Sequence, residues 1–280
     1  MFPRPMRRRS RHHPETNQRE DGSDDIAVEA WRYIIQDYSA RQLSFPQDKL
    51  PALSGIAWWF AKHFPEARGD EYLAGLWRSQ LPESLLWFHG LPLHANTSRP
   101  DSFLAPSWSW ASLNSEYVEW SDASRDEAKA KIIWAEIKLR SSDPFGSVLA
   151  GRLTIHGCRR KAYLEPSKTH AERYHIFSGH NRFQQMSSVN AAMIAMVYLD
   201  HYNDSEQNGS SYNTAVSARQ VDCMRITGCG GILIEQVDDN RSASGQVTGC
   251  IWRRIGIVMF LDGAEKEWWK GSSEDSILLE

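Results

Sequence analysis

The sequence predicts an α+β protein in which an N-terminal helical layer packs on a mostly antiparallel C-terminal β-sandwich or partly open barrel. Two observations support this fold class. Apolar residues first recur at spacings of three and four, as on one face of a helix, and later alternate or form short apolar runs, as in strands. No helical run separates the later strands, which disfavours a parallel α/β sheet, and helices followed by strands are typical of α+β proteins.

The helical layer is expected over residues 25–104, where apolar stripes predict three helices. The first spans about residues 25–39, with the stripe Ala27, Trp31, Ile34, Ile35 and Tyr38. The second spans about residues 48–64, with the stripe Leu50, Leu53, Ala57, Phe60 and Phe64. We expect Trp58 and Trp59 to broaden its buried face. The third spans about residues 70–81 and places Tyr72, Leu73, Leu76 and Trp77 on one side.

The β-rich region is expected over residues 105–280. Its first segment, Pro106–Ser112, alternates small polar residues with Trp108 and Trp110. This period predicts a strand with both tryptophans on one face, followed by a hairpin that returns over Glu116–Trp120. Further strands are predicted at Ile132–Leu139, Arg152–Gly157, Ala191–Leu199, Val221–Thr227, Gly231–Val237, Cys250–Leu261 and Ser276–Leu279. Two polar stretches, near residues 165–188 and 200–220, are expected to be surface insertions.

Composition excludes several classes of protein. With 41% hydrophobic and 24% charged residues, the chain of 280 residues has ordinary globular usage and is not wholly disordered, collagenous or coiled-coil. Residues 1–24 lack apolar periodicity and are expected to form a disordered basic and polar tail. Residues 1–13 contain five arginines and no acid, so the net charge of −3 leaves −8 for the remainder. This acidic remainder gives no long-range attraction to nucleic acid.

The sequence also indicates a compartment. No segment approaches the roughly 20 apolar residues of a membrane span, and the arginine-rich start lacks the apolar segment of a secretory signal. We therefore expect an intracellular, cytoplasmic protein with no membrane partner. Its cysteines, Cys158, Cys223, Cys229 and Cys250, are expected to be reduced thiols, several of them buried. The basic head is expected to be a solvated tail, with a nuclear-import patch, a phosphate contact or a transit peptide as the alternatives.

Histidines and cysteines offer no complete metal motif. His170, His175 and His180 are spaced by five residues, which aligns them on neither a helix face nor a strand face. Cys223 and Cys229 are separated by more residues than the pairs of structural zinc sites. We therefore expect no bound metal.

Nucleophile, phosphate and acid–base motifs are likewise incomplete. No Gly-x-Ser-x-Gly elbow occurs, and Ser54 lies inside a helical pattern. The segment Gly228–Gly231 precedes a strand rather than a helix, so it predicts a tight turn or bulge and not a phosphate cradle. The clustered acids lie in polar turns, where carboxylates are usually solvated: Asp122, Asp126, Glu127, Asp238 and Asp239. We assign no catalytic, cofactor-binding or metal-binding residue and expect no cofactor.

The 12 tryptophans allow two interpretations. Nine of them lie between Trp31 and Trp134, and large aromatic side chains bury roughly 150–250 Å² each, so one cluster can hold the helical layer and the sheet together. We favour this core interpretation. In the alternative, Trp108 and Trp110 form an exposed platform for sugar rings or bases, although no basic residue lies between Arg99 and Arg125.

Five blocks occur in order along the chain: Trp31–Leu43, Asp48-Lys-Leu-Pro-Ala-Leu-Ser-Gly-Ile-Ala57, Tyr72-Leu-Ala-Gly-Leu-Trp77, Leu85-Leu-Trp87 and Ala105-Pro-Ser-Trp-Ser-Trp-Ala-Ser112. Together they resemble the region C-terminal to the heterokaryon incompatibility domain of filamentous fungal proteins. Downstream, Asp143-Pro-Phe-Gly146, Gly151-Arg-Leu153 and Arg254-Ile-Gly256 resemble its β region, so the resemblance covers about residues 27–280.

The resemblance implies a fungal, intracellular protein linked to nonself recognition and to growth arrest or cell death after cell fusion. The family's effector domain should precede Trp31, where only the polar tail stands, so no catalytic residue is transferred from the family. A truncated relative, a stand-alone accessory module and an incomplete gene model remain open as explanations.

The leading hypothesis is therefore a non-catalytic interaction or regulatory module with a protein partner. One alternative is a hydrolase-type enzyme with a site between the helical layer and the sheet. Another is a tryptophan-based binder of carbohydrate or nucleic acid, although the charge distribution argues against nucleic acid.

Overall fold

A computed structural model describes residues 23–41, 43–64, 69–89, 99–114, 117–166, 174–177, 195–200, 219–237, 250–261 and 263–280. Residues 1–22 of the expected tail and most of the two expected insertions lie outside the described residues. Within the described part, the predicted α+β class is confirmed, because helices come first and a mostly antiparallel sheet follows. No helix in this part is long and apolar enough to cross a membrane.

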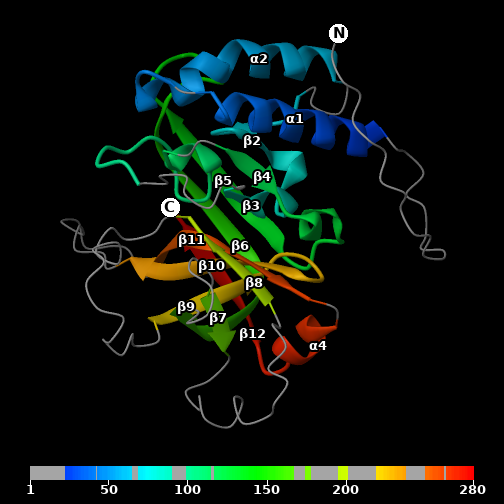
Figure 1. Ribbon diagram of the computed structural model, residues 1–280. Coiled ribbons are helices and arrows are strands. Elements are labelled where there is room, and N and C mark those ends of the chain that lie inside the picture. Colours follow the sequence, from blue (N-terminus) through cyan, green and yellow to red (C-terminus); the bar gives the residue numbers. More distant parts are fainter. Residues whose placement is uncertain are drawn as a thin grey trace.

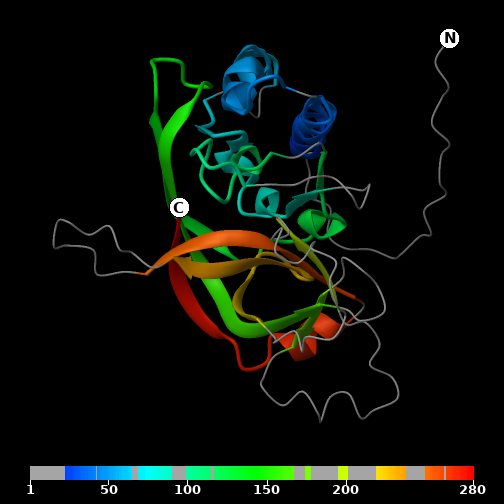
Figure 2. The same ribbon diagram turned by 60° about the vertical axis from the view of Figure 1, so that its left-hand side comes forward.

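Two of the three predicted helices are present. Helix α1 spans Ser23–Ser39 and α2 spans Lys49–His63, with a short 3-10 helix, Pro46–Asp48, before α2. The two helices lie side by side on the outside of the molecule, on the end away from the sheet (Figures 1 and 2). Their predicted stripes point inward, and the fully buried members include Trp31, Ile35, Leu53 and Phe60.

The predicted third helix is wrong. Residues 72–77 form a tight hairpin of β1, Tyr72–Leu73, and β2, Leu76–Trp77, and short 3-10 helices follow at Arg78–Gln80 and Glu83–Leu85. The turn contains two consecutive residues with positive φ, Ala74 at 49° and Gly75 at 100°, which no right-handed helix accommodates. The apolar residues are buried as predicted, but on a hairpin.

The predicted hairpin around Trp108 and Trp110 is also wrong. Residues 110–112 form a 3-10 helix, in which the Ser109 hydroxyl accepts a hydrogen bond from the Ala111 N–H, because serine caps such turns readily. The predicted return strand exists as β4, Val118–Trp120, but it pairs with β3, Trp87–His89. A further 3-10 helix, Asp122–Arg125, leads to the sheet.

Among the described residues, eight strands form one sheet, and every later strand that the sequence predicts belongs to it with shifted ends. The strands are β5 Lys131–Leu139, β6 Val148–Pro166, β7 Tyr174–Phe177, β8 Ala195–Leu199, β9 Arg219–Arg225, β10 Gly230–Val237, β11 Ile251–Phe260 and β12 Ser273–Leu279. Two elements were not predicted: β7, which lies in the first expected insertion, and the short helix α4, Ala264–Trp268.

The ladders form a closed circuit of five strands. In order, β10 pairs with β9, β9 with β6, β6 with β12, β12 with β11, and β11 with β10. Only the β11–β12 ladder among these is parallel. Strands β5 and β7 extend β6, and β8 extends β11. The sheet therefore curls instead of stacking as two separate layers, and β5 with the start of β6 rises beside the helical part (Figure 2).

Two hydrophobic clusters hold this arrangement together. The larger joins the helical part to one side of the curled sheet, and at its centre Trp31 contacts Phe60 and Trp77, with ring centroids 5.0 and 5.4 Å apart. The smaller lies inside the sheet beneath α4, where Phe260 packs on Trp268 at 5.2 Å. The aromatic cluster that was predicted to hold the helical layer and the sheet together is thus present.

Candidate protein-interaction surface

The side chains of the three evenly spaced histidines that the sequence offered for a metal are not among those that the structure describes. His170 and His180 lie outside the described residues, as do Asp238 and Asp239, and only the backbone of His175 is described, in β7. Within the described part, no group of three or more His, Cys, Asp or Glu side chains is placed to hold a metal ion.

The cysteines are free, as expected, but only Cys223 is buried. Burial raises the pKa of the Cys223 thiol. Cys229 donates a hydrogen bond from Sγ to Asp126 Oδ2 at 2.8 Å, and burial together with this carboxylate raises its pKa to about 12. An activated thiol needs the opposite shift, so neither cysteine is poised as a nucleophile.

The glycine-rich segment is a turn between β9 and β10, as predicted. Thr227 Oγ1 accepts a hydrogen bond from the Gly230 N–H at 3.1 Å. A Cβ on Gly230 would lie 2.7 Å from Leu86 Cδ1, so the glycine allows the sheet to approach the helical part. Ser54 lies in the middle of α2 and is half-buried.

On the sheet, Ser276, His156 and Glu274 contact one another in the sequence serine, histidine, acid, as the residues of a hydrolase triad do. Ser276 Oγ lies 3.0 Å from His156 Nδ1, and His156 Nε2 lies 3.2 Å from Glu274 Oε2. However, the His156 and Glu274 side chains are 41% and 63% exposed, so water screens the pair. At His156, strand β6 is hydrogen-bonded to β5 and β12 on both sides, so its N–H groups cannot stabilise an oxyanion. The geometry does not support hydrolysis.

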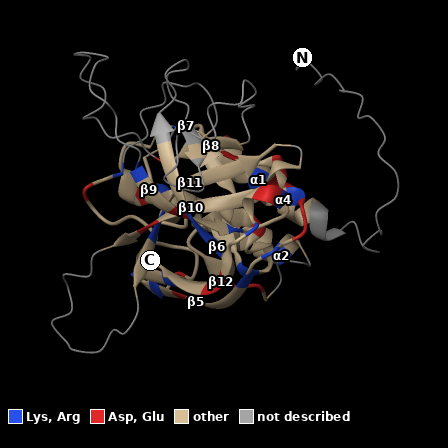
Figure 3. Ribbon diagram, turned by 90° about the horizontal axis from the view of Figure 1, so that it is seen from below, with Lys and Arg blue, Asp and Glu red and all other residues tan. Residues whose placement is uncertain are grey.

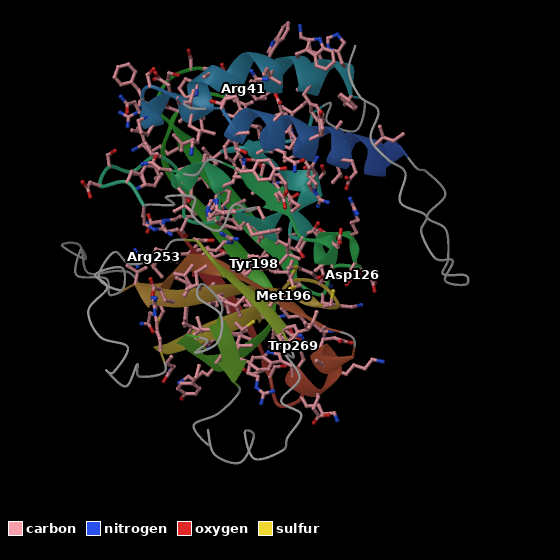
Figure 4. The ribbon with its side chains drawn as sticks, viewed as in Figure 1. Arg41, Asp126, Met196, Tyr198, Arg253 and Trp269 are labelled. Carbon is pink, nitrogen blue, oxygen red and sulfur yellow. The ribbon has the colours of Figure 1, made fainter. Side chains whose placement is uncertain are left out.

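The alternative hypothesis places an enzyme site between the helical part and the sheet, and a buried structural cluster occupies this region. The Arg254 side chain, on β11, is fully buried and pairs with Asp200 at the end of β8. Its guanidinium donates to the Trp87 carbonyl and lies 3.5 Å from the centre of the Trp87 ring, on β3. Nearby, Tyr198 on β8, which Figure 4 labels, packs on Phe88 with ring centroids 4.6 Å apart.

Both tryptophans of the alternative platform interpretation are buried. Trp108 and Trp110 have no exposed surface, which confirms the core interpretation. Trp110 Nε1 and Trp31 Nε1 both donate to the Gly75 carbonyl at 3.0 Å, so the β1–β2 turn joins α1 to the 110–112 segment. Neither ring can serve as an exposed stacking surface.

Three tryptophans of the described residues are exposed, Trp134 on β5 and two on α2 that we expected to be buried. Trp58 is 50% exposed and Trp59 is 48% exposed, both on the outer face of α2. That expectation was wrong because Leu50, Leu53, Ala57 and Phe60 already fill the contact between α2 and the core. Side chains project from α2 on the side that faces away from the sheet (Figure 4).

This outer face is unusual because it contains no charge over most of its length. From Leu50 to Ala61 the helix has no charged residue, and every exposed side chain in that stretch is apolar or absent: Pro51, Ala52, Gly55, Ile56, Trp58 and Trp59. We call these six residues the α2 face. A helix that is apolar all round is normally buried, so this face has the composition of a contact surface.

Neighbouring residues of α2 hold both exposed rings in place. The Lys62 ammonium lies 3.8 Å from the centre of the Trp58 ring. The Trp59 ring stacks on His63 at 4.3 Å with an interplanar angle of 17°. His63 Nδ1 in turn lies 2.8 Å from the Trp59 carbonyl oxygen. Because the rings are already ordered, a partner would lose less side-chain entropy on binding them.

The sheet side of the molecule differs, since Lys, Arg, Asp and Glu are intermixed along its strands and α4 (Figure 3). Such a surface favours solvation.

The α2 face was detectable from the sequence as an uncharged run of helical length that includes two adjacent tryptophans.

No family model, curated protein or solved structure matches the chain.

Proposed function

We propose that the chain is a non-catalytic protein-interaction module and that it docks its partner on the α2 face. The observation that supports this is the pair of exposed, pre-ordered tryptophans, Trp58 and Trp59, on a helix with no charge between Leu50 and Ala61. Tryptophan is enriched among the few residues that dominate binding energy at protein interfaces.

The exposed area of the Trp58 and Trp59 rings sets how much free energy a partner gains by covering them. Each ring leaves about half of its roughly 150–250 Å² accessible, or about 100 Å². At about 25 cal/mol per Å², covering each ring contributes about 2.5 kcal/mol. Losing one such anchor should therefore weaken the contact more than tenfold, since every 1.4 kcal/mol changes the dissociation constant tenfold.

The biological setting we propose is nonself recognition in filamentous fungi. The support is the resemblance of residues 27–280 to the region C-terminal to the heterokaryon incompatibility domain. In that setting the module would have a regulatory role, with a protein as its partner.

The test compares the apparent mass of the tagged chain in extracts of the cells that make it. We expect a species larger than the monomer of 32.0 kDa for the wild type, and the monomer for Trp58→Ser/Trp59→Ser. Tyr33→Ser, at a 71% exposed site on α1, is the matched control and should keep the larger species. Circular dichroism verifies that the variants are folded. A wild-type monomer, or a double variant that keeps the complex, contradicts the proposal.

A further inference from the structure

We propose that the partner on the α2 face is a second copy of this chain, with the two α2 helices packed antiparallel about a two-fold axis at Gly55. The inference rests on the proposed function and specifies its partner. Three properties of the face support it: the central position of Gly55, the distribution of large and small residues on either side of it, and the placement of charges at the two ends.

Gly55 lies at the centre of the exposed face. At 3.6 residues per turn, Pro51 and Ala52 lie about one turn before it and Trp58 and Trp59 about one turn after it, all on the same side of the helix. A Cβ placed on Gly55 would meet no atom within 4 Å. Two helices can therefore approach most closely at this residue, because neither has a side chain there.

The large and small residues on either side of Gly55 are complementary to the same residues of a second copy related by the two-fold axis. An antiparallel pairing about Gly55 places Trp58 and Trp59 of one copy over Ala52 and Pro51 of the other, so large rings meet small residues on both sides of the axis. A parallel pairing would oppose the tryptophans to each other and leave the small residues uncovered. The face is thus complementary to itself in one orientation.

The charges at the ends of the face agree with the same orientation. Asp48 and Lys62 are both exposed, and each lies seven residues from Gly55, which is two helical turns. Antiparallel pairing brings Asp48 of one copy opposite Lys62 of the other, and the two-fold axis repeats this pair. Parallel pairing would oppose like charges.

The first measurement is the mass of the purified full-length chain by sedimentation velocity over a range of concentrations. We expect the wild type to approach twice 32.0 kDa. Gly55→Leu should weaken the dimer at least tenfold, since it adds a side chain at the closest approach. At a concentration where both proteins are monomeric its melting temperature should not fall, because the site is open and leucine favours helix. A monomeric wild type at all concentrations would overturn the inference.

A charge exchange tests the orientation. Asp48→Lys alone and Lys62→Glu alone should each weaken the dimer several-fold, because each opposes like charges across the axis. Asp48→Lys/Lys62→Glu should restore it, because the exchanged charges attract again only between antiparallel copies. A double variant no tighter than the single variants overturns the inference.

The outcomes also separate this inference from the proposed function. A large species in extracts that depends on Trp58 and Trp59, together with a monomeric purified chain, leaves the proposed function standing and overturns the second copy as the partner. Binding of the purified monomer to anionic phospholipid vesicles, lost in Trp58→Ser/Trp59→Ser, overturns it in favour of a lipid surface.

Discussion

The buried Arg254 side chain offers the sharpest test of how the helical part is joined to the sheet. Its guanidinium connects three elements, since it pairs with Asp200 after β8, donates to the Trp87 carbonyl and stacks on the Trp87 ring of β3. Burial lowers the pKa of Arg254 to about 10, and the Asp200 carboxylate opposes that shift, so the arginine remains charged at neutral pH. Arg254→Met keeps much of the side-chain volume and removes the charge.

The expected cost is about 4 kcal/mol. Removing one partner of a buried ion pair costs about 3–5 kcal/mol, because the other charge stays buried and loses the group that it contacts directly. The lost contact with the Trp87 ring is worth up to about 2 kcal/mol when desolvated, but the two losses are not additive. Since domains are stable by about 5–15 kcal/mol, Arg254→Met should be folded but markedly destabilised.

The assay is urea unfolding followed by tryptophan fluorescence, in a double-mutant cycle with Asp200→Leu. Arg254→Met/Asp200→Leu should be more stable than Arg254→Met by about 2 kcal/mol, since no uncompensated charge remains. A loss below about 1 kcal/mol in Arg254→Met, or two losses that add in the double variant, would refute an ion pair between the buried side chains.

The sequence correctly predicts those helices and strands whose apolar residues recur at a regular spacing. The stripes of α1 and α2 have a spacing of three and four, and β6 alternates buried residues such as Leu153 and Ile155 with accessible ones. These patterns depend only on which face is covered, so they predict the fold class. The strand ends were less predictable, because they depend on the ladders that neighbouring strands provide.

In the segments that were predicted wrongly, local backbone conformation and side-chain capping decide the structure, and the spacing of apolar residues does not. Tyr72 to Trp77 has a helical stripe, but positive φ at Ala74 and Gly75 makes a hairpin. The alternation around Trp108 resembles a strand, yet the Ser109 hydroxyl caps a 3-10 turn instead. In both cases short polar or glycine residues decide the backbone, and apolar spacing alone does not reveal this.

The candidate site could be predicted only in part. An uncharged run from Leu50 to Ala61 is visible in the sequence, but periodicity does not show which apolar face the core covers. Trp58 and Trp59 are exposed because the space beneath α2 is already filled by Leu53 and Phe60. The Arg254 cluster joins β3, β8 and β11, so its partners are brought together only by the fold.

Three further predictions concern the core. Trp108→Ala and Trp110→Ala should each cost about 3–5 kcal/mol in urea unfolding, because each removes a fully buried ring, and unchanged stability of both would argue against the core interpretation. Gly75→Ala should lower the melting temperature, because its φ is 100° and the new Cβ would lie 2.5 Å from Trp110 Nε1; a melting temperature equal to the wild type would contradict this. The last prediction is a pH dependence due to His89, whose ring nitrogens are both buried although the residue keeps some accessible surface. Burial, aided by the charges of Arg254 and Lys49, lowers the pKa of His89 from 6.5 to about 3. Below pH 6.5 the unfolded chain therefore binds a proton that the folded chain does not bind until about pH 3, so the stability contributed by neutral His89 is lost as the pH falls through this window. The loss approaches about 1.4 kcal/mol per pH unit, or about 2 kcal/mol between pH 6.5 and pH 5. His89→Gln removes this proton, so the free energy of unfolding should fall by about 2 kcal/mol less in the variant than in the wild type over that interval. Equal losses in the two proteins would show that His89 is not held neutral by the fold.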